Sequence, residues 1–296
     1  MAIPLACQEN RNLVNVDCPI CNENRSRSFY ANANGGCIVQ CLNDGLIYLN
    51  PRLAEKPPGE VHSDYVREDN IAWFARARRP VLRREAARIL GIKRGGNLLD
   101  VGCATGIFFE FFPRESWNLY GVDTSILGAR IAGERSGANV FCGMLCDAKY
   151  PDRFFDVVSV LDALYYFPDP KGTLHEVCRL LKGDGILAIE IPGLNYRLMR
   201  DRGPLCWLLD RRWVRGFAGS GHLYYFSPQT IRRLLRTSGF EVFAAFAEQA
   251  SLDRGWLAQT LNRFHFILAR AVFAVTRGRV SIAGKELYLA RKANSK

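Results

Sequence analysis

The chain contains 296 residues, of which 48% are hydrophobic and 23% are charged, and its formal net charge is +11. This length and composition can bury a sizeable core, so we expect one large and one small domain rather than a repeat array or low-complexity chain. The start of the chain lacks the basic-then-apolar pattern of a signal peptide, and no apolar run reaches the ~18 residues of a membrane span. We therefore expect a cytoplasmic protein whose positive charge raises the question of an anionic partner.

Ten cysteines in such a chain favour metal binding or burial over a disulfide framework. Cys18 and Cys21 form a Cys-x-x-Cys knuckle, which can present two thiolates to Zn²⁺ from one tight turn. Nineteen residues separate Cys21 from Cys41, and Asp44 occupies the position of a fourth cysteine. We expect these four residues to bind Zn²⁺. A site with Cys37 as the fourth ligand, or a degenerate ribbon without metal, are the alternatives.

A helix expected before residue 90 is rich in arginine, and a later insertion carries three more. The helix holds Arg76, Arg78, Arg79, Arg83, Arg84 and Arg88, and the insertion holds Arg211, Arg212 and Arg215. Basic helices are more often solvated faces, or contacts with anionic surfaces, than nucleic-acid sites. No motif of alternating basic and aromatic residues typical of RNA binding accompanies them.

The segment 97–106 carries the strongest chemical signal. An apolar run ends at Asp100, and a turn containing Gly102, Ala104 and Gly106 follows directly, before a helix that we expect over 107–112. A buried strand that leads into a tight turn and a helix start forms a nucleotide-sized cradle. The third glycine of a dinucleotide fingerprint and the Lys-Ser/Thr pair of a P-loop are both missing.

A second strand is expected over 117–123 and ends in Asp123, followed by Thr124. Asp123 lies 17 residues after Gly106, near the spacing at which a carboxylate at a strand tip accepts hydrogen bonds from both ribose hydroxyls. The simpler alternative is that Asp123 only caps the next helix.

In this order, the pattern resembles the class I S-adenosylmethionine (SAM) methyltransferases. The loop matches their motif I, 155–162 resembles their fourth strand, and 174–191 resembles the helix, turn and fifth strand that follow. The resemblance covers about residues 60–292. It implies an α/β, Rossmann-like, doubly wound seven-stranded sheet that closes with an antiparallel pair, 241–247 and 284–290. It also implies that SAM contacts Asp100, Gly102, Ala104, Gly106, Asp123, Thr124, Leu161 and Asp162.

The positions that would identify the chemistry depart from the family. Tyr165 and Tyr166 stand where relatives carry a Glu-His pair, so Tyr166 is expected to orient an acceptor rather than act as a base. His222 lies in a segment resembling the family's His-Leu-x-x-Phe-Ser sequence and is our candidate general base. Its structural alternative is to cap the helix that starts at 227–228. Met144 replaces the usual adenine-binding aspartate, with Asp147 as a substitute or a plain turn residue.

We expect three regions: a zinc-ribbon-like module over 1–55, a helical connector over 56–90 and the SAM-binding domain over 91–296. The domain would include an insertion near 194–222 and an apolar helix near 253–276. This helix is expected to pack in the core by default, with a substrate lid, membrane surface or subunit contact as alternatives. The oligomeric state stays open.

Residues 46–52 resemble the tail of the zinc ribbon on a branch that often methylates sugars, glycan precursors or natural products. The function that this resemblance implies is methylation of a small or glycan-like acceptor, at a hydroxyl group. An RNA methyltransferase that uses the ribbon and the basic surface is the first alternative, and a SAM-binding protein without catalysis is the second.

Overall fold

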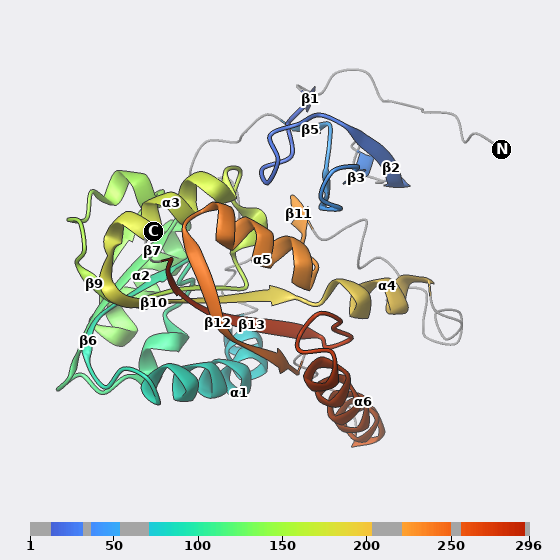
Figure 1. Ribbon diagram of the computed structural model, residues 1–296. Helices are drawn as coiled ribbons and strands as arrows, with labels where there is room; N and C mark the ends of the chain where they lie inside the picture. Colours follow the sequence, from blue (N-terminus) through green and yellow to red (C-terminus); the bar gives the residue numbers. More distant parts are fainter. Residues whose placement is uncertain (1–12, 32–36, 54–70, 203–220, 250–255, 294–296) are drawn as a thin grey trace.

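A computed structural model describes residues 13–31, 37–53, 71–202, 221–249 and 256–293 (Figure 1). These residues form a seven-stranded sheet, a four-stranded sheet and a two-stranded sheet. Several predicted parts lie outside the described residues: 1–12, 32–36 and 54–55 of the module, 56–70 of the connector, 203–220 of the insertion with its Arg211, Arg212 and Arg215, and 253–255 of the apolar helix.

The large sheet has the strand order β12-β13-β10-β9-β6-β7-β8. β6 through β10 run parallel, whereas β13 is antiparallel to both β10 and β12. β9 is buried at all but one position, as expected of a parallel strand covered on both faces. The strands are β6 (Gly96–Val101), β7 (Trp117–Asp123), β8 (Asn139–Cys142), β9 (Phe155–Leu161), β10 (Leu181–Pro192), β12 (Phe240–Glu248) and β13 (Lys285–Lys292). The predicted fold class and closing antiparallel pair are confirmed.

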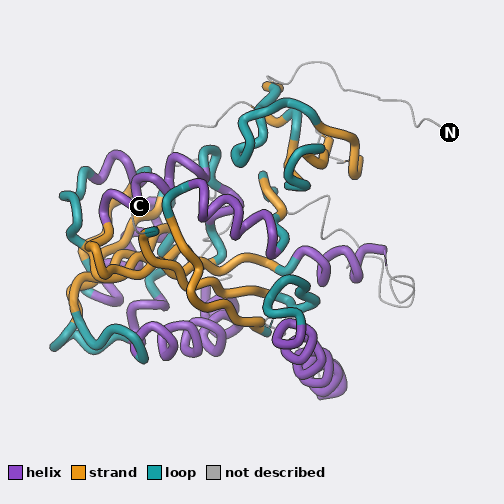
Figure 2. Tube along the Cα trace, in the orientation of Figure 1, coloured by secondary structure: helices purple, strands orange, loops and turns teal. Residues whose placement is uncertain are grey.

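Helices cover both faces of this sheet, as the layers in Figure 2 show. α3 (Pro170–Leu180) and α5 (Pro228–Thr237) pack into one hydrophobic cluster. α1 (Ile71–Leu90), η1 (Ile107–Phe111) and α2 (Ile126–Ser136) pack into the other. The remaining helical elements are η2 (Leu145–Ala148), η3 (Leu164–Tyr166), α4 (Leu194–Arg202) and α6 (Trp256–Val275).

The helix expected after the glycine loop is a short 3₁₀ turn, η1, rather than an α-helix. Phe112 ends it in an extended conformation, with φ −111° and ψ 120°. Pro113 explains this difference, because proline disfavours helical backbone in the residue before it.

Cys37 and Cys41 lie in a small antiparallel sheet whose fourth strand comes from a distant part of the chain. β2 (Ser26–Ala31), β3 (Cys37–Cys41) and β4 (Ile47–Leu49) pair in sequence order, and β11 (Tyr224–Tyr225) completes the sheet against β4. β1 (Leu13–Val14) pairs with β5 (Arg52–Leu53) beside it. We call residues 13–53 of this assembly the N-terminal module.

Polar contacts at the junction hold the module against the body. Arg52 donates from Nη1 to the Tyr224 hydroxyl at 2.9 Å and from Nη2 to the Pro168 carbonyl at 3.1 Å. The Tyr224 hydroxyl in turn donates to the Pro168 carbonyl at 2.8 Å. Buried Leu46 and Tyr48 of the module share one hydrophobic cluster with the body. Module and body are therefore one packed unit at this junction.

No helix among the described residues is both long enough and apolar enough to cross a membrane.

Replacing Tyr224 by phenylalanine is expected to weaken the junction. The change removes the hydroxyl that joins Arg52 to Pro168 and leaves a buried guanidinium group short of a partner. We expect the free energy of unfolding to fall by about 1–3 kcal/mol, measured by urea denaturation with circular dichroism. Tyr120→Phe, in β7 and away from the junction, is the control and should change it by less than about 0.5 kcal/mol. Equal losses in the two variants would contradict this account.

Candidate active site

The glycine loop depends on left-handed backbone conformations. Gly102 and Gly106 have φ of 80° and 71°, and Ala104 has φ 47°. A Cβ atom at Gly102 would lie 2.7 Å from the Ala163 Cβ, and one at Gly106 would lie 2.9 Å from Ala132. Glycine is therefore required at both positions, by conformation and by space.

Asp123 is joined to this loop by its carboxylate. Oδ2 accepts a hydrogen bond from the Ala104 amide and Oδ1 accepts one from the Ser125 amide, both at 2.8 Å. Ser125, rather than Asp123, caps α2 by accepting from the Gly128 amide at 3.1 Å. A carboxylate is an acceptor with about four lone-pair sites, and at the end of this strand it is of the type that accepts from ribose hydroxyls. Thr124, the next residue, is half-buried.

Asp100 lies at the end of β6 and is almost fully buried. Its Oδ1 accepts a hydrogen bond from the Ser159 hydroxyl at 2.7 Å. Burial is the main cause that raises the pKa of Asp100 to about 7; the Ser159 hydrogen bond acts against burial, and the nearby Asp123 charge acts with it. The carboxyl therefore titrates near neutrality and gains from a cationic ligand group.

A pocket opens beside the loop and brings five of the predicted SAM contacts together: Asp100, Gly102, Ala104, Leu161 and Asp162. Gly106, Asp123 and Thr124 are not among its lining residues. The Thr105 hydroxyl oxygen is buried at the same pocket without a hydrogen-bond partner in the described part of the chain. A polar ligand could satisfy it. The pocket thus offers a polar ligand the backbone of the glycine loop, the Asp100 carboxyl group and the Thr105 hydroxyl group.

Sequence reasoning missed a buried cluster of charges that borders the pocket. Arg78 of α1 donates from Nη1 to Glu190 at 2.8 Å and lies 3.6 Å from Asp162. The Lys285 ammonium contacts Asp162 at 2.5 Å and Glu190 at 2.6 Å. We call Arg78, Asp162, Glu190 and Lys285 the charge cluster. The signal available in the sequence was Glu190 itself, a lone acid inside an apolar strand.

The charge cluster determines which acids are ionised. Burial acts to raise the pKa of Asp162, but the charges of Lys285 and Arg78 hold this pKa well below its usual range. The same two cations lower the pKa of Glu190 against its burial. Burial and the adjacent Glu190 charge raise the pKa of Glu85 well above its usual value, so this fully buried side chain is neutral. The cluster therefore balances two positive and two negative charges.

His222 and Tyr166 lie in a second group, next to the SAM pocket. The His222 ring is buried, and its centroid lies 4.0 Å from that of Tyr165 in a tilted contact and 4.9 Å from that of Tyr166 in an edge-to-face contact. The Tyr165 hydroxyl donates to Asp162 at 2.6 Å, which connects the two groups. Capping is not the role of His222, because Ser227 and Thr230 form the capping box of α5 themselves.

The environment of His222 also contains Arg197 of α4. Its two terminal nitrogens lie 3.1 Å from Nδ1 and 3.3 Å from Nε2 of the ring. A neutral imidazole offers only one acceptor nitrogen, so one of these contacts is the hydrogen bond. The guanidinium charge opposes a second positive charge on the ring.

Tyr166 fits an orienting role better than that of a base. Burial raises its pKa to about 12, and the Asp162 charge contributes in the same direction. At neutral pH its phenol is therefore protonated and can only donate or accept a hydrogen bond.

The predicted adenine region offers no buried carboxylate. Met144 precedes η2, and the Asp147 amide donates to its carbonyl at 3.1 Å. Asp147 is exposed in this turn, which agrees with its interpretation as a turn residue.

The N-terminal module brings four potential metal ligands together. One ligand atom from each of Cys18, Cys21, Cys41 and Asp44 lies within 4.8 Å of all the others. The Cys18 sulfur is 3.2 Å from the Asp44 carboxylate, and the Cys21 and Cys41 sulfurs are 3.6 Å apart. Ligands of a tetrahedral Zn²⁺ site at about 2.0–2.3 Å have similar separations. Cys37 lies at the opposite end of β3 from Cys41 and is outside this cluster.

Comparison with known proteins identifies the family. A family model described as a methyltransferase domain matches residues 74–245. The chain belongs to the class I SAM-dependent methyltransferase family. The glycine loop, Asp100, Asp123 and Asp162 all lie within the matched residues.

Three curated proteins are similar to parts of this chain. A ubiquinone biosynthesis O-methyltransferase of Klebsiella pneumoniae is 34% identical over 181 residues, 58% of this chain and 64% of the relative. One from Erwinia tasmaniensis is 34% identical over 97 residues, 31% of this chain and 40% of the relative. A sterol 24-C-methyltransferase of Aspergillus fumigatus is 32% identical over 111 residues, 35% and 29% of the two chains. The methyltransferase thus spans less than two thirds of each.

Solved structures agree on the fold. A chain from the complex between the Haloferax volcanii Trm112 methyltransferase activator and a methyltransferase has a TM-score of 0.52 at 20% identity, covering 78% of this chain and 99% of that one. A SAM-dependent methyltransferase from Thermotoga maritima has a TM-score of 0.50 at 19% identity, covering 76% and 97%.

The Asp100 carboxyl predicts how SAM affinity of this methyltransferase depends on pH. With a pKa of about 7, Asp100 loses its charge as the pH falls, and the affinity for a cationic ligand should fall by up to about ten-fold per pH unit below 7. Calorimetric titration between pH 6 and 8.5 measures this. Asp100→Asn should bind SAM at least about ten-fold more weakly at pH 8 and lose most of the pH dependence.

The melting temperature of Asp100→Asn is the control, because it separates weaker SAM binding from loss of folding. Because burial raises the pKa of Asp100 in the folded state, its contribution to stability is complete below its unfolded pKa and is lost as the pH rises towards 7. Asp100→Asn should therefore match or exceed the wild-type melting temperature at pH 8. Weaker SAM binding together with a lower melting temperature would contradict the assigned role.

Proposed function

We propose that this protein transfers the methyl group of SAM to a hydroxyl group of a small or glycan-like acceptor. The observation that carries the proposal is the glycine loop between Asp100 and Asp123, which opens on a pocket bounded by Asp162. These groups come from the adjacent ends of β6, β7 and β9, where open parallel sheets bind their ligands.

Each group of residues in the pocket has a different role in binding SAM. The loop backbone approaches the ligand closely, Asp123 accepts the ribose hydroxyls, and Asp100 faces the cationic methionine end. Leu161 and Phe108 line the same pocket with apolar surface that excludes water. SAM, when bound, supplies an electrophilic methyl group on a positively charged sulfur. Transfer then depends mainly on the position of the acceptor.

We assign the proton transfer to His222. In the transfer the sulfur of SAM would keep the electron pair of the broken carbon–sulfur bond, and an unprotonated ring nitrogen of His222 would take up the proton that the acceptor hydroxyl loses. The Arg197 guanidinium contacts both ring nitrogens of His222, so it has to move off one nitrogen before that nitrogen can accept a proton. The negative charge that develops on the acceptor oxygen attracts the guanidinium and favours this movement. Tyr166, protonated and next to the ring, orients the acceptor hydroxyl.

The relatives and the ring cluster support the acceptor class. Two of the three relatives described are named as O-methyltransferases and one as a C-methyltransferase. Tyr165, Tyr166 and Tyr225 surround His222 with aromatic rings, which pack against the flat or apolar face of a cyclic acceptor. Of these three tyrosines Tyr166 is the one that is only partly buried, so it is the ring that a cyclic acceptor with a hydroxyl group can reach.

We propose Zn²⁺ as the metal of the N-terminal module. Three thiols and one carboxylate form a donor set that Zn²⁺ prefers, and with four protein ligands the site is closed, as structural zinc sites are. The ion would hold β3 and the turn after it against the Cys18–Cys21 knuckle.

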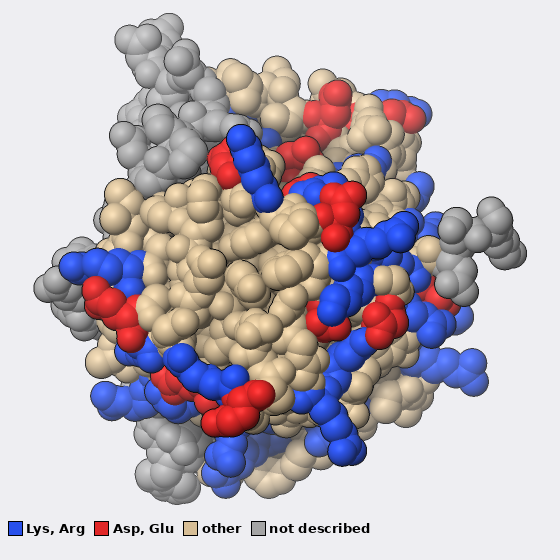
Figure 3. All heavy atoms as spheres, turned by 90° about the vertical axis from the view of Figure 1, so that its left-hand side faces the viewer, with Lys and Arg blue, Asp and Glu red and all other residues tan. Residues whose placement is uncertain are grey.

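The described surface favours a small acceptor over RNA. Several α1 arginines have carboxylate partners: Arg78 is buried in the charge cluster, Arg79 pairs with Glu110, and Arg84 and Arg88 pair with Glu248. On the face seen in Figure 3, basic and acidic side chains lie side by side around an uncharged area. A continuous basic surface, which a nucleic-acid site requires, is not present on that face.

Methyl transfer itself is tested with labelled SAM against pools of hydroxylated metabolites and glycan precursors. His222→Gln should reduce turnover by about 100-fold or more and leave the SAM dissociation constant within about two-fold. His175→Gln, on the exposed face of α3, is the control. Tight SAM binding without transfer to any pool would support the non-catalytic alternative. Unchanged turnover in His222→Gln would refute the base role.

Elemental analysis tests the metal. We expect one zinc per chain in the wild type and in Cys37→Ser, and loss of zinc in Cys18→Ser and Asp44→Ala. The same two variants should melt at a lower temperature, because metal binding contributes to folding. Cys142→Ser, at an exposed cysteine outside the cluster, is the control. Zinc retained in Asp44→Ala but lost in Cys37→Ser would favour the alternative ligand set.

A further inference from the structure

Helix α6 presents a large apolar face to solvent. Phe264, Ile267, Leu268 and Val275 are 69%, 66%, 56% and 84% exposed. Together with exposed Ala271 they follow the i, i+3, i+4, i+7, i+11 spacing of one side of a helix. In Figure 1 the helix (dark red) extends beyond the edge of the sheet.

The opposite side of α6 already holds the helix on the body. Ala269 and Phe273 are buried there with Ala247 and Ala283, and Asn262 is buried on the same side. α6 is therefore apolar on two sides and packed on one. Because exposing a continuous apolar face to water is unfavourable, such a face indicates a contact that the isolated chain lacks.

Basic residues border the exposed face. Arg263 and Arg270 are exposed and lie one helical turn to either side of Ile267. From residue 254 to residue 284 the sequence contains five arginines and no Asp or Glu. The contact surface therefore combines apolar side chains with uncompensated positive charge.

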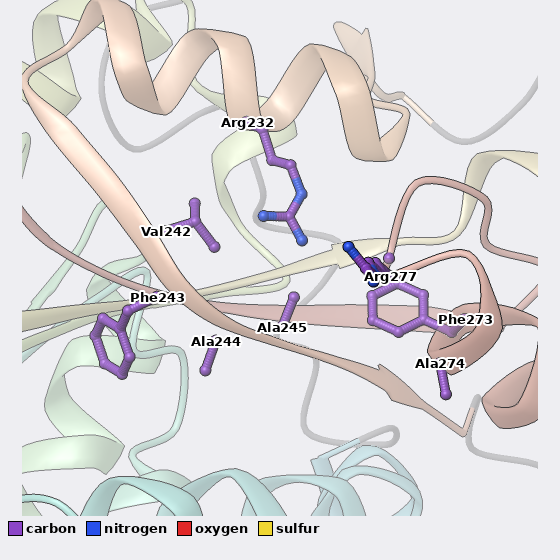
Figure 4. A pocket seen from close by; sticks show the side chains of 9 residues that line it. Arg232, Val242, Phe243, Ala244, Ala245, Phe273, Ala274 and Arg277 are labelled. Carbon is purple, nitrogen blue, oxygen red and sulfur yellow. The ribbon is translucent and has the colours of Figure 1, made fainter.

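Next to this face lies a groove with two further arginines (Figure 4). Arg232 points from α5 towards β12, and Arg277 comes from the turn after α6. A Cβ at Gly278 would lie 3.0 Å from Arg232 Nη2, which places this guanidinium beside the turn. Phe273 and Val242 provide apolar walls, and no acidic residue lines the groove. In the described part of the chain neither arginine forms an ion pair within 4.0 Å, although the Arg232 guanidinium lies 5.3 Å from the centroid of the Tyr288 ring and its charge acts to lower the pKa of the buried Glu286.

We propose that α6 binds the surface of an anionic phospholipid membrane, with its exposed face among the acyl chains and a lipid phosphate between Arg232 and Arg277. A helix that lies in the interface buries apolar side chains below the headgroups and keeps arginines at the level of the phosphates. The arrangement of Ile267 between Arg263 and Arg270 meets both requirements. The proposal is independent of the acceptor and of the methyl-transfer step.

The charge and the apolar character of this face favour an anionic membrane over a second copy of the chain and over a nucleic acid. A second copy of the chain would bring its own arginines against the same face, and like charges across an interface are unfavourable. Nucleic-acid interfaces are polar, whereas the described part of α6 exposes the large apolar side chains Phe264, Ile267, Leu268 and Val275.

Vesicle co-sedimentation with the full chain tests the proposal. We expect binding to vesicles of phosphatidylcholine and phosphatidylglycerol in equal parts, and at least about ten-fold weaker binding to phosphatidylcholine alone or at about 0.5 M salt. Phe264→Gln/Ile267→Gln and Arg232→Gln/Arg277→Gln should each weaken binding to the anionic vesicles by about ten-fold or more. Melting temperatures establish that both variants are folded.

Matched controls change the same residue types elsewhere. Ile92→Gln/Met199→Gln replaces two exposed apolar side chains outside α6, and Arg83→Gln/Arg94→Gln replaces two exposed arginines. Both should bind vesicles as the wild type does. Equal binding of the wild type to neutral and anionic vesicles would overturn the proposal. So would a dimer that Phe264→Gln/Ile267→Gln converts to monomers, or RNA binding that Arg232→Gln/Arg277→Gln abolishes without any vesicle binding.

Discussion

The buried charge cluster is the constraint on which the arrangement of α1, β9, β10 and β13 around the SAM pocket depends. Its four members come from α1, the turn after β9, the end of β10 and the start of β13, and Glu190 is completely buried. Ionic groups are costly to bury, and removing one partner from such a cluster typically costs about 3–5 kcal/mol. Because the cluster borders the SAM pocket through Arg78 and Asp162, the position of the pocket depends on a complete set of charges.

The same cluster connects the pocket to the proposed base. Asp162 accepts from Tyr165, whose ring stacks on His222, and the Leu223 amide donates to the Tyr165 carbonyl at 3.0 Å. Leu223 then accepts from the Leu49 amide of β4. A continuous series of contacts therefore runs from the SAM pocket through His222 to the N-terminal module. The N-terminal module is therefore joined to the SAM pocket by hydrogen bonds through Leu223, Tyr165 and Asp162.

The parts of the structure that sequence reasoning predicted are those that depend on local pattern. Buried parallel strands appear as apolar runs, and the loop appears as glycines at fixed offsets from Asp100 and Asp123. The Cys-x-x-Cys knuckle and Asp44 are also local signals, and the structure brings them together with Cys41. By contrast, the pairing of β11 with β4 and the approach of Arg197 to His222 join segments far apart in sequence. Neither has a signature within a short window.

Arginine shows why the second kind of feature is difficult to predict. Arg78 is buried against Glu190, Arg84 and Arg88 share Glu248, and Arg232 faces a groove without acids. In the sequence all four are ordinary basic residues of predicted helices. What separates them is the strand that lies opposite: β10 and β12 present buried glutamates to α1, whereas β12 presents Val242 and Ala245 to the groove below α5. The net charge of +11 is therefore distributed unevenly. Carboxylates neutralise several arginines of α1, whereas no acidic residue lines the groove that holds Arg232 and Arg277.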